Sequence, residues 1–264
     1  MKNAILSQLS PEYPWKDRFQ HFVTIGSTND HLKALARQGA PHGTVLIADH
    51  QSNGHGRLGR SFQSSAGVGV YLSILLRPDC LPGELMHLTC AAAVAMCDAV
   101  EQAAGFRPGI KWTNDLVFGR QKLGGILTEL GFANGRVDYA IIGIGINCCQ
   151  AQEDFAPEIR SIAASLSMVT GTKIDRSRVA AAMMDALQQM DKSLLMEKQE
   201  ILRKYRENCV TIGQDISLVQ GDEVRHGKAL SVDGDGGLVV RFAVGTFQTV
   251  NSDEVSVRGM YGYV

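Results

Sequence analysis

The sequence predicts an α+β protein in which a mixed sheet is flanked by helices and followed by a small all-β domain. Residues 68–76 place an apolar side chain at every second position, as a strand does. Residues 85–104 are rich in alanine and other apolar residues at helical length, and Gly105 then predicts the helix end. From about Thr211 short strands are broken by glycine-rich turns. Strands mixed with helices and hairpins favour α+β over a regular parallel βαβ series.

The other elements of the N-terminal part follow from caps and turn residues. Residues 22–25 are rich in β-forming types and predict a strand. Ser27 and the polar residues after it can cap a helix, which Gly39 and Pro41 should end. Residues 44–48 predict the next strand. The glycine-rich segment then lies between two strands.

The middle of the chain predicts more strands and then one long helix. Three further β-like runs are expected at residues 110–112, 122–130 and 137–146. The pairs Asn114-Asp115 and Asn134-Gly135 are turn-prone, and the second is a strong hairpin signal. Residues 178–205 predict one long helix capped by Asp175. We therefore expect a larger domain at residues 1–210 and a small β domain at residues 211–264.

Composition places the chain among ordinary globular proteins. Its 264 residues are 45% apolar and 20% charged, with a formal net charge of −1, which gives no support to nucleic-acid binding. No run approaches eighteen apolar residues, and residues 1–15 lack the order of a secretory signal. The six cysteines have no C-x-x-C spacing and the seven histidines do not cluster. We expect a cytoplasmic protein without a membrane segment, with reduced thiols and no metal site of its own.

The glycine-rich segment at residues 54–60, with the sequence G-H-G-R-L-G-R, is the first candidate for chemistry. It matches the dinucleotide fingerprint G-x-G-x-x-G, but it leads into serines and a strand, where that fingerprint requires a helix. A plain surface loop is the other alternative. Glycines let the backbone approach a ligand, and Arg57 and Arg60 add forked cationic donors. We expect an anionic ligand and a loop that closes over it.

Three later segments carry polar residues next to predicted strands. Residues 111–115 read K-W-T-N-D, residues 122–127 read K-L-G-G-I-L, and residues 142–147 read I-G-I-G-I-N. Each also has a structural explanation: a tight turn, a solvated edge lysine, and close packing of backbone against a helix. The functional interpretation of the third segment is room for a flat ligand, with Asn147 at its edge.

In this order, the motifs resemble those of the biotin protein ligase family. The resemblance runs from about Phe22 through S-T-N at residues 27–29, Gln51 with the loop at residues 54–60, and the three segments above, to D-E-V-S-V-R-G at residues 253–259. It implies a class II synthetase-like, biotin-lipoate ligase catalytic domain with a small C-terminal SH3-like β-barrel. Members that repress transcription carry an N-terminal winged helix, for which the residues before Phe22 are too few. We therefore expect no DNA binding.

The resemblance also implies roles for individual residues. The biotin contacts would be Ser27, Thr28, Asn29, Gln51, Gly54, His55, Gly56, Arg57, Lys122, Gly124 and Gly125. The ATP contacts would be Arg57, Arg60, Phe62, Lys111, Asn114, Lys122 and Asn147. The catalytic residues would be Lys122, Arg57, Arg60, Asp115 and Lys111. Two positions depart from the family pattern: His55 replaces an arginine, so its charge depends on pH, and Thr113 replaces a proline, which makes the turn less rigid.

The implied reaction has two steps. The biotin carboxylate attacks the α-phosphate of ATP, with Mg²⁺ arriving on the nucleotide, and biotinoyl-5′-AMP forms. A lysine of a biotin carboxyl carrier protein domain then displaces AMP, with Asp115 orienting or deprotonating its amine. A lipoate or octanoate ligase or transferase of the same fold is the alternative enzyme, and a non-catalytic ligand or nucleic-acid binder is the alternative class. A homodimer is expected only because it is common in the family.

Overall fold

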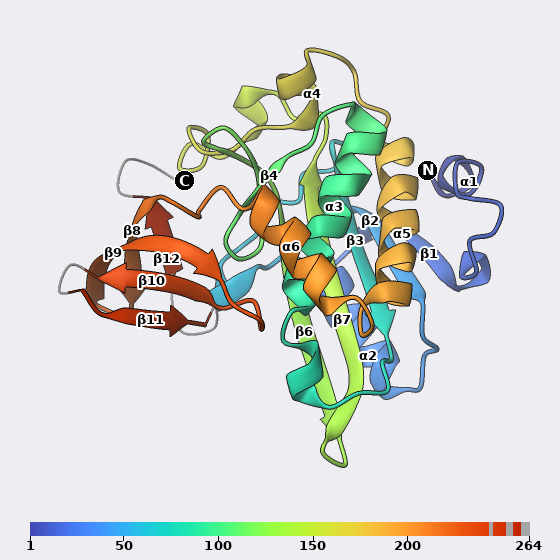
Figure 1. Ribbon diagram of the computed structural model, residues 1–264. Coiled ribbons are helices and arrows are strands. Elements are labelled where there is room, and N and C mark those ends of the chain that lie inside the picture. The colour runs from blue at the N-terminus through green and yellow to red at the C-terminus, as the bar shows by residue number, and fades with distance from the viewer. Residues whose placement is uncertain (243–244, 252–255, 260–264) are drawn as a thin grey trace.

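The computed structural model describes residues 1–242, 245–251 and 256–259, which form two sheets and the helices around them (Figure 1). The larger sheet has seven strands in the order β1-β2-β3-β7-β6-β5-β4. Its strands are β1 (Phe19–Ile25), β2 (Thr44–Gln51), β3 (Gly69–Leu76), β4 (Gly109–Lys111), β5 (Asp115–Phe118), β6 (Gln121–Ala133) and β7 (Arg136–Asn147). Only β1 and β2 pair in parallel, and the other neighbours are antiparallel. The predicted mixed sheet is confirmed.

Helices cover both faces of this sheet. On one face lie α3 (Leu88–Ala104), α5 (Arg176–Ser193) and α6 (Lys198–Asn208), and on the other lies α2 (Thr28–Arg37) (Figure 1). Successive side chains of β3 point to opposite faces of the sheet, so this strand contributes to two apolar cores. Ile74 packs in the large core, and Leu75 packs in the small core under α2. The face that carries α2 also carries the pocket described below.

Several shorter elements complete the larger domain. They are α1 (Lys2–Leu6), α4 (Leu166–Thr170) and the 3-10 turns η1 (Lys16–Arg18), η2 (Arg57–Gly59), η3 (Pro82–Leu85) and η4 (Gln152–Asp154). Together, η3 and α3 make the one segment of the described chain, Pro82–Ala104, that is long and apolar enough to cross a membrane. Of its most apolar window, 72% is buried inside the protein, as in a core helix.

Most of the turn and cap predictions are confirmed. Ser27 caps α2 by accepting a hydrogen bond from the Asp30 amide, and Gly105 ends α3 in the left-handed conformation. Asn134 and Gly135 have φ angles of 51° and 75°, which is the conformation expected of a two-residue hairpin turn between β6 and β7. Local sequence therefore determines where these elements begin and end.

Two predictions about the elements are wrong. Residues 178–205 do not form one helix, because the chain breaks at residues 194–197 into α5 and α6. Both helices pack on α3, and the break lets α5 also pack on β3 while α6 also reaches β4 and β9 of the C-terminal sheet. Asp115 was assigned to a turn, yet it begins β5, which pairs with the start of β6. Tertiary packing overrides local preference at both places.

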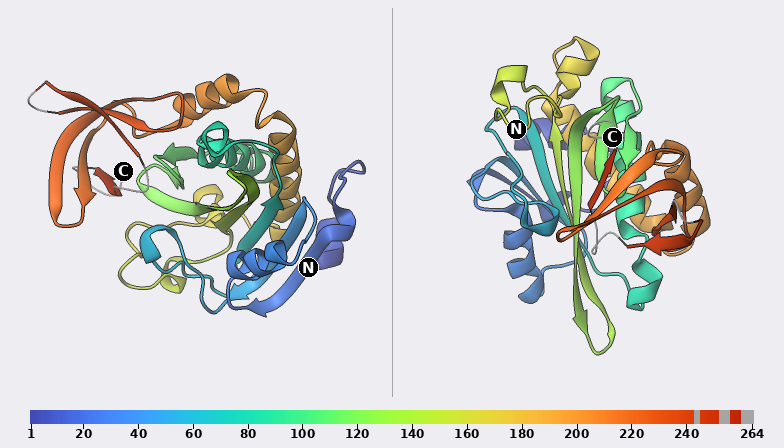
Figure 2. Two further views of the ribbon diagram at one scale, coloured as in Figure 1. Left: turned by 90° about the horizontal axis from the view of Figure 1, so that it is seen from below. Right: turned by 90° about the vertical axis from the view of Figure 1, so that its left-hand side faces the viewer.

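The C-terminal sheet stands beside the larger domain (Figure 2). It is antiparallel, in the order β11-β10-β9-β8-β12. Its strands are β8 (Asp215–Gln220), β9 (Glu223–Val232), β10 (Leu238–Phe242), β11 (Phe247–Val250) and β12 (Ser256–Gly259). The predicted small all-β unit is confirmed, and we propose that the division between the domains lies at the predicted residues 210 and 211, between α6 and β8. Residues 253–255 of the closing motif lie outside the described residues.

The motif residue Trp112 joins the two parts of the chain. Its indole Nε1–H donates to the Gly236 carbonyl at 2.9 Å, and its backbone N–H donates to Thr211 Oγ1 at 2.9 Å. The neighbouring carbonyl of Thr113 accepts from Tyr205 Oη at 3.0 Å. The aromatic residue of the K-W-T-N-D motif is thus buried at the domain junction rather than in the ligand cavity.

The cap of α5 predicts a measurable pH dependence of stability. The Asp175 carboxylate accepts from the Ser177 amide at 2.8 Å and from Gln8 Nε2 at 3.2 Å. Desolvation by burial raises its pKa, but these hydrogen bonds outweigh it, so the pKa lies below the ordinary value. Because the folded-state pKa lies below the unfolded one, the stabilisation is complete above the unfolded pKa and disappears as pH falls through the folded one.

We expect Asp175→Ala to lower the free energy of unfolding by about 1 kcal/mol at pH 7, as the loss of a helix cap does. Urea unfolding of both proteins at pH 7 and at steps below about pH 4 measures the gap, which should shrink as the wild-type carboxylate is protonated. Asp175→Asn keeps a capping oxygen and should lose less. A gap of the same size at every pH would contradict this role of Asp175.

Candidate active site

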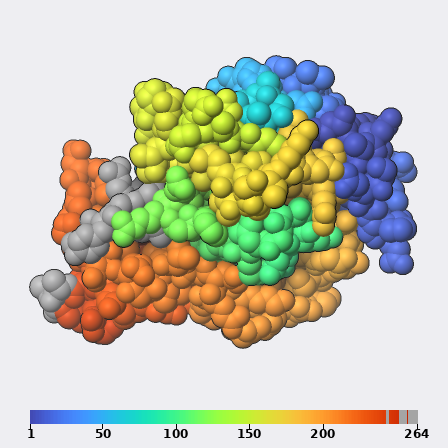
Figure 3. All heavy atoms as spheres, turned by 90° about the horizontal axis from the view of Figure 1, so that it is seen from above, coloured from blue at the N-terminus to red at the C-terminus, as the bar shows by residue number. Residues whose placement is uncertain are grey.

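A cavity of about 280 Å³ lies on the face of the large sheet that also carries α2. Its walls come from the first turn of α2, the end of β2, the loop at residues 54–62, β5, β6, β7 and residues 155–163. Residues 150–165, in yellow-green, lie against the cyan segment of the loop on this side of the molecule (Figure 3). Gln63 fastens them together, since it donates to the Asp154 carbonyl at 2.8 Å and accepts from the Ala156 amide at 3.0 Å.

The glycine-rich loop is a folded hairpin rather than a dinucleotide fingerprint. It joins the antiparallel strands β2 and β3, with no helix after it. His55 and Ser61 pair across it, and the Gly56 amide donates to the Arg60 carbonyl at 2.7 Å. At its tip Leu58 and Gly59 have φ angles of 56° and 69°. The loop therefore holds Arg57 and Arg60 at the mouth of the cavity, and its predicted closure over a ligand stays a prediction.

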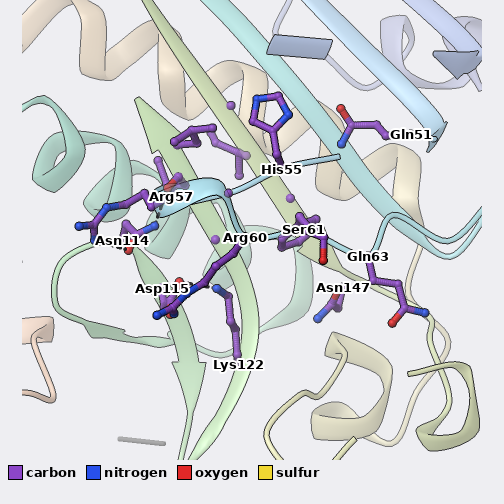
Figure 4. Close-up of a pocket in the computed structure, with 18 of the residues that line it drawn as sticks. Gln51, His55, Arg57, Arg60, Ser61, Gln63, Asn114, Asp115, Lys122 and Asn147 are labelled. Atoms are coloured by element: carbon purple, nitrogen blue, oxygen red, sulfur yellow. Dashed lines mark hydrogen bonds and ion pairs between the residues drawn. The ribbon is translucent and has the colours of Figure 1, made fainter. Parts of the chain in front are cut away.

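The charged residues of the cavity gather beneath this hairpin (Figure 4). Lys122 Nζ lies 2.5 Å from Asp115 Oδ1, and Arg60 points toward both. Arg57 Nη1 donates to Asn114 Oδ1 at 3.2 Å, and Asn114 Nδ2 donates to the Ile126 carbonyl at 2.6 Å. Among the lining residues, Arg57, Arg60 and Lys122 are the Arg and Lys side chains, whereas Asp115 is the only carboxylate. An anion is the ligand that this balance favours.

Gly125 makes room for the central ion pair. A Cβ atom at this position would lie 3.2 Å from Lys122 Nζ and 3.4 Å from Asp115 Oδ1. Lys122 itself is held by its backbone, which donates to the Ile162 carbonyl at 2.7 Å and accepts from the Ala164 amide at 2.9 Å. The lysine is therefore fixed at both ends rather than solvated at a strand edge.

The other end of the cavity is lined by uncharged polar groups. Ser27, Thr28 and Asn29 come from the first turn of α2, and Gln51 comes from the end of β2. The Thr28 amide donates to Gln51 Oε1 at 2.8 Å. All three residues of the S-T-N motif are buried. The cavity thus has a cationic end and an amide- and hydroxyl-lined end.

The glycine-bearing face of β7 at residues 143–147 lies against Phe62 and Asn29, and the two glycines also line the cavity. A Cβ atom at Gly145 would lie 2.4 Å from the Phe62 ring, and one at Gly143 would lie 2.0 Å from Asn29 Oδ1. The glycines therefore admit one side chain of the loop and one from the first turn of α2, and the predicted room for a flat ligand stays a prediction. Asn147 is buried beside them, where it donates to the Ala164 carbonyl at 3.1 Å and accepts from Gln150 at 3.1 Å.

The structure brings most of the expected site residues to the cavity, and it leaves three outside its lining. The lining includes Ser27, Thr28, Asn29, Gln51, His55, Gly56, Arg57, Arg60, Phe62, Asn114, Asp115, Lys122, Gly125 and Asn147. Lys111 is buried on β4. Gly124 packs on the Gly145 carbonyl, and Gly54 packs on Ser64 and the Phe62 carbonyl, so both glycines permit close backbone approach.

Some residues that line the cavity were not among the site residues predicted from the sequence. They are Leu58, Ser61, Gln63, Ile126, Leu127, Phe155, Ile159, Ile162 and Ala163, besides the β7 residues of the third segment. Residues 155–163 belong to an irregular stretch without periodicity, so no sequence signal identified them. Only the backbone pairing of Lys122 with residues 162–164 shows that this stretch closes the cavity.

The cysteines are free thiols, and most of them are buried as expected. Burial raises the pKa of the Cys97 thiol to about 12, which keeps it protonated and unreactive. Among the described residues, no group of three His, Cys, Asp or Glu side chains could hold a metal ion. Asp115 is the one carboxylate among the residues that line the cavity.

Comparison with known proteins agrees with this arrangement. A family model described as the biotin/lipoate A/B protein ligase family matches residues 22–147. The bifunctional ligase/repressor BirA of Bacillus spizizenii is 35% identical over 238 residues, which cover 89% of this chain and 73% of the relative. The biotin--[acetyl-CoA-carboxylase] ligase of Mycobacterium tuberculosis is 31% identical over 239 residues, which cover 88% of this chain and 86% of the relative.

A solved structure extends the likeness to three dimensions. The biotin protein ligase of Aquifex aeolicus, solved in complex with biotin and ATP, superposes with a TM-score of 0.78 at 28% identity and covers 91% of this chain and 98% of its own. The mixed sheet and the cavity under an arginine-bearing loop therefore define the biotin and lipoate ligase class. Within that class, the chain belongs to the biotin protein ligase family.

Proposed function

We propose that this protein is an ATP-dependent biotin protein ligase, which forms biotinoyl-5′-AMP and transfers the biotinoyl group to a lysine of another protein. The observation that carries this conclusion is one cavity with two unlike ends. Lys122, Arg57 and Arg60 gather at one end, and the S-T-N motif and Gln51 form the other. A ligand with a carboxylate at one end and a polar, uncharged ring at the other fits both. Biotin has this chemistry.

The first step needs cations because both reactants are anions. A carboxylate about 4 Å from a phosphate oxygen meets repulsion on the order of 4 kcal/mol per charge pair at an effective dielectric of about 20. We propose that Lys122 contacts the biotin carboxylate and the α-phosphate together, while Arg57 and Arg60 hold phosphate oxygens. Mg²⁺ carried by ATP would supply further positive charge. Pyrophosphate leaves, and the mixed anhydride remains under the hairpin.

The remaining site residues divide between the two substrates. We propose that Ser27, Thr28, Asn29 and Gln51 bind the ureido ring, together with the loop backbone at His55 and Gly56. Phe62 and Asn147 line the part of the cavity next to β7, where the adenylate would extend, and Asn114 lies beside Arg57 at the cationic end. Lys111, Gly54 and Gly124 lie behind this lining, so we propose supporting roles for them rather than ligand contact.

The second step needs an uncharged amine on the acceptor lysine. Free lysine has a pKa of about 10.4, so a carboxylate near the anhydride can orient it and take its proton. Asp115 is the carboxylate of the cavity lining, and Lys122 holds it in place at 2.5 Å. The amine then attacks the carbonyl carbon, AMP departs, and an amide bond forms. We propose Asp115 as the base of this step.

The acceptor is proposed to be the biotin carboxyl carrier domain of a biotin-dependent carboxylase. The name of the Mycobacterium tuberculosis relative, which is a ligase for acetyl-CoA carboxylase, supports this choice. A homodimer and the absence of DNA binding stay predictions. The alternative of a lipoate or octanoate ligase gains no support, because the relatives that cover most of this chain are named for biotin or BirA.

Pyrophosphate release from ATP tests the proposed function. We expect release that depends on biotin and that lipoate and octanoate do not support at equal concentration. Release with lipoate instead would establish the alternative enzyme. No ligand-dependent release with any of the three acids would leave only a binding protein and overturn the proposal.

Phe62 provides a test of the nucleotide end. Its ring lies against Gly145, where a Cβ would come within 2.4 Å, and it meets Tyr71 edge to face at 6.3 Å between centroids. We expect Phe62→Ala to raise the KM for ATP about tenfold, since an aromatic stacking contact contributes on the order of 1 kcal/mol. The Kd of biotin, measured by calorimetry without ATP, should change less than about twofold. An unchanged KM for ATP would remove Phe62 from the nucleotide site.

A further inference from the structure

Ser73 is a fully buried hydroxyl in the middle of β3, and the backbone ladder of the sheet does not use it. Its strand neighbours are apolar, and it is absent from the cavity lining. A buried hydroxyl costs free energy unless it is hydrogen-bonded. Its partners are two side chains of the first turn of α2: Thr28 Oγ1 at 2.7 Å and Asn29 Oδ1 at 2.5 Å. Ser73 therefore ties the sheet to the S-T-N motif from behind.

The donors and acceptors around Ser73 leave one orientation for the Asn29 amide. Asn29 Nδ2 donates to Glu129 Oε2 at 2.8 Å, and a carboxylate accepts only. The amide oxygen of Asn29 must therefore face Ser73, which donates its single proton to it. Lys33 Nζ donates to the other Glu129 oxygen at 2.8 Å and keeps that carboxylate in place. The second N–H of the Asn29 side-chain amide takes no part in these hydrogen bonds.

The same reasoning orients Gln51. Its Oε1 accepts from the Thr28 amide at 2.8 Å, so its nitrogen end points the other way and donates to Ser64 Oγ at 3.1 Å. Ser73 Oγ also lies 2.7 Å from Thr28 Oγ1, and the Thr28 hydroxyl donates to Gln51 Oε1 at 3.0 Å, which holds the oxygen end of Gln51 toward α2. One N–H of Gln51 is left over as well. The uncharged end of the cavity thus offers amide donors to a ligand.

Gly143 completes the slot that holds Asn29. It is the cross-strand partner of Ser73, on the neighbouring strand β7. A Cβ atom at Gly143 would lie 2.0 Å from Asn29 Oδ1 and 2.7 Å from Asn29 Cγ. The amide of Asn29 therefore sits in a space that exists only because one strand carries glycine and the other carries a short hydroxyl side chain.

We propose that Ser73 and Gly143 form a positioning pair for the ligand ring. They fix Asn29 and Thr28 so that the cavity offers N–H donors and thereby selects a ring with a carbonyl acceptor. This proposal rests on the proposed function, in which the ring is the ureido ring of biotin. It adds Ser73, which lies behind the cavity lining, and Gly143, which lines the cavity and leaves the space that the Asn29 amide occupies.

Titration calorimetry with two ligands tests the pair. Biotin carries a ureido carbonyl oxygen, whereas 2-iminobiotin near neutral pH carries a guanidinium that offers donors only. We expect the wild-type protein to prefer biotin. Ser73→Ala should weaken biotin binding about tenfold and 2-iminobiotin binding less than about threefold, so the preference between them falls. A merely structural defect would weaken both ligands alike.

Gly143→Ala places a methyl group against the Asn29 amide from the neighbouring strand β7. It should therefore also reduce the preference for biotin over 2-iminobiotin. The control is Thr44→Val, which removes another buried hydroxyl on the sheet that donates to the Pro41 carbonyl at 2.7 Å, far along β2 from Gln51. It should lose thermal stability without changing the preference. Ser73→Ala should leave the KM for ATP within about twofold.

Two outcomes would overturn the positioning role. One is a Ser73→Ala protein that keeps the wild-type preference for biotin, and the other is an equal weakening of both ligands in Ser73→Ala and Gly143→Ala. Failure of the proposed function is distinguishable, because the wild-type protein would then bind neither ligand and release no pyrophosphate with biotin. Tm measured for every variant separates loss of folding from loss of selectivity.

Discussion

Replacing Lys122 by alanine is expected to slow the formation of biotinoyl-5′-AMP by about a thousandfold. Lys122 Nζ lies in the cavity at 2.5 Å from Asp115, with 28% of its side chain exposed. Its removal takes away a cation where two anions must meet and leaves the Asp115 carboxylate beside them. Loss of one preorganised group that stabilises developing charge lowers kcat by about 10²–10³. Biotin-dependent pyrophosphate release measures this step alone.

Lys198→Ala is the matched control for this prediction. Lys198 has the same side-chain exposure of 28% and a comparable ion pair, at 2.6 Å to Asp235, but it lies outside the cavity. Its loss should leave pyrophosphate release within about twofold of the wild-type rate. Near-normal release by Lys122→Ala would remove Lys122 from the catalytic residues. Equal losses in both variants would point to a general effect of surface charge.

Replacing Asp115 by alanine is expected to slow transfer to the acceptor lysine about a hundredfold, and adenylate formation by less than about tenfold. The carboxylate is needed as a base only when the acceptor amine arrives. The first step still has Lys122, which loses its partner at 2.5 Å and is less well placed. The two steps therefore separate in this variant.

Mixing biotinoyl-5′-AMP with the enzyme and then with the acceptor domain measures transfer in a single turnover, without the first step. The Asp115→Ala protein should transfer slowly at neutral pH and recover part of the loss as pH rises, because more of the acceptor amine is then uncharged. Equal losses in the two half-reactions, or no recovery at high pH, would contradict the assignment of Asp115 as the base.

The parts of the fold that sequence predicts well are those set by local chemistry. Ser27 and Asp175 cap α2 and α5 because short polar side chains can reach the first free amides. The Asn134-Gly135 turn and the end of α3 at Gly105 follow from residues that accept positive φ. The predicted long helix fails because the chain breaks between α5 and α6. Both helices pack on α3, but α5 also packs on β3 and α6 also packs on β4 and β9, a division that helical periodicity does not encode.

The site residues also fall into two groups, those that local sequence identifies and those that only long-range contacts bring to the cavity. Motifs identified Lys122, Arg57, Arg60 and Asp115 because their chemistry is unusual next to strands and glycines. Lys111 shares a motif with Asp115, but β4 buries it outside the cavity lining. Residues 155–163 and Ser73 carry no motif, since their roles depend on backbone pairing and on contacts between strands distant in sequence. Only the folded arrangement reveals them.

If the cavity activates biotin and delivers it to a protein lysine, a biotin carboxyl carrier domain incubated with this protein, ATP and Mg²⁺ should gain the mass of one biotinoyl group. Intact-mass analysis of the carrier domain measures this gain, which we expect on a single lysine and only when biotin and ATP are both present. No added mass with biotin, or equal modification with lipoate or octanoate in its place, would show that the protein is not a biotin protein ligase.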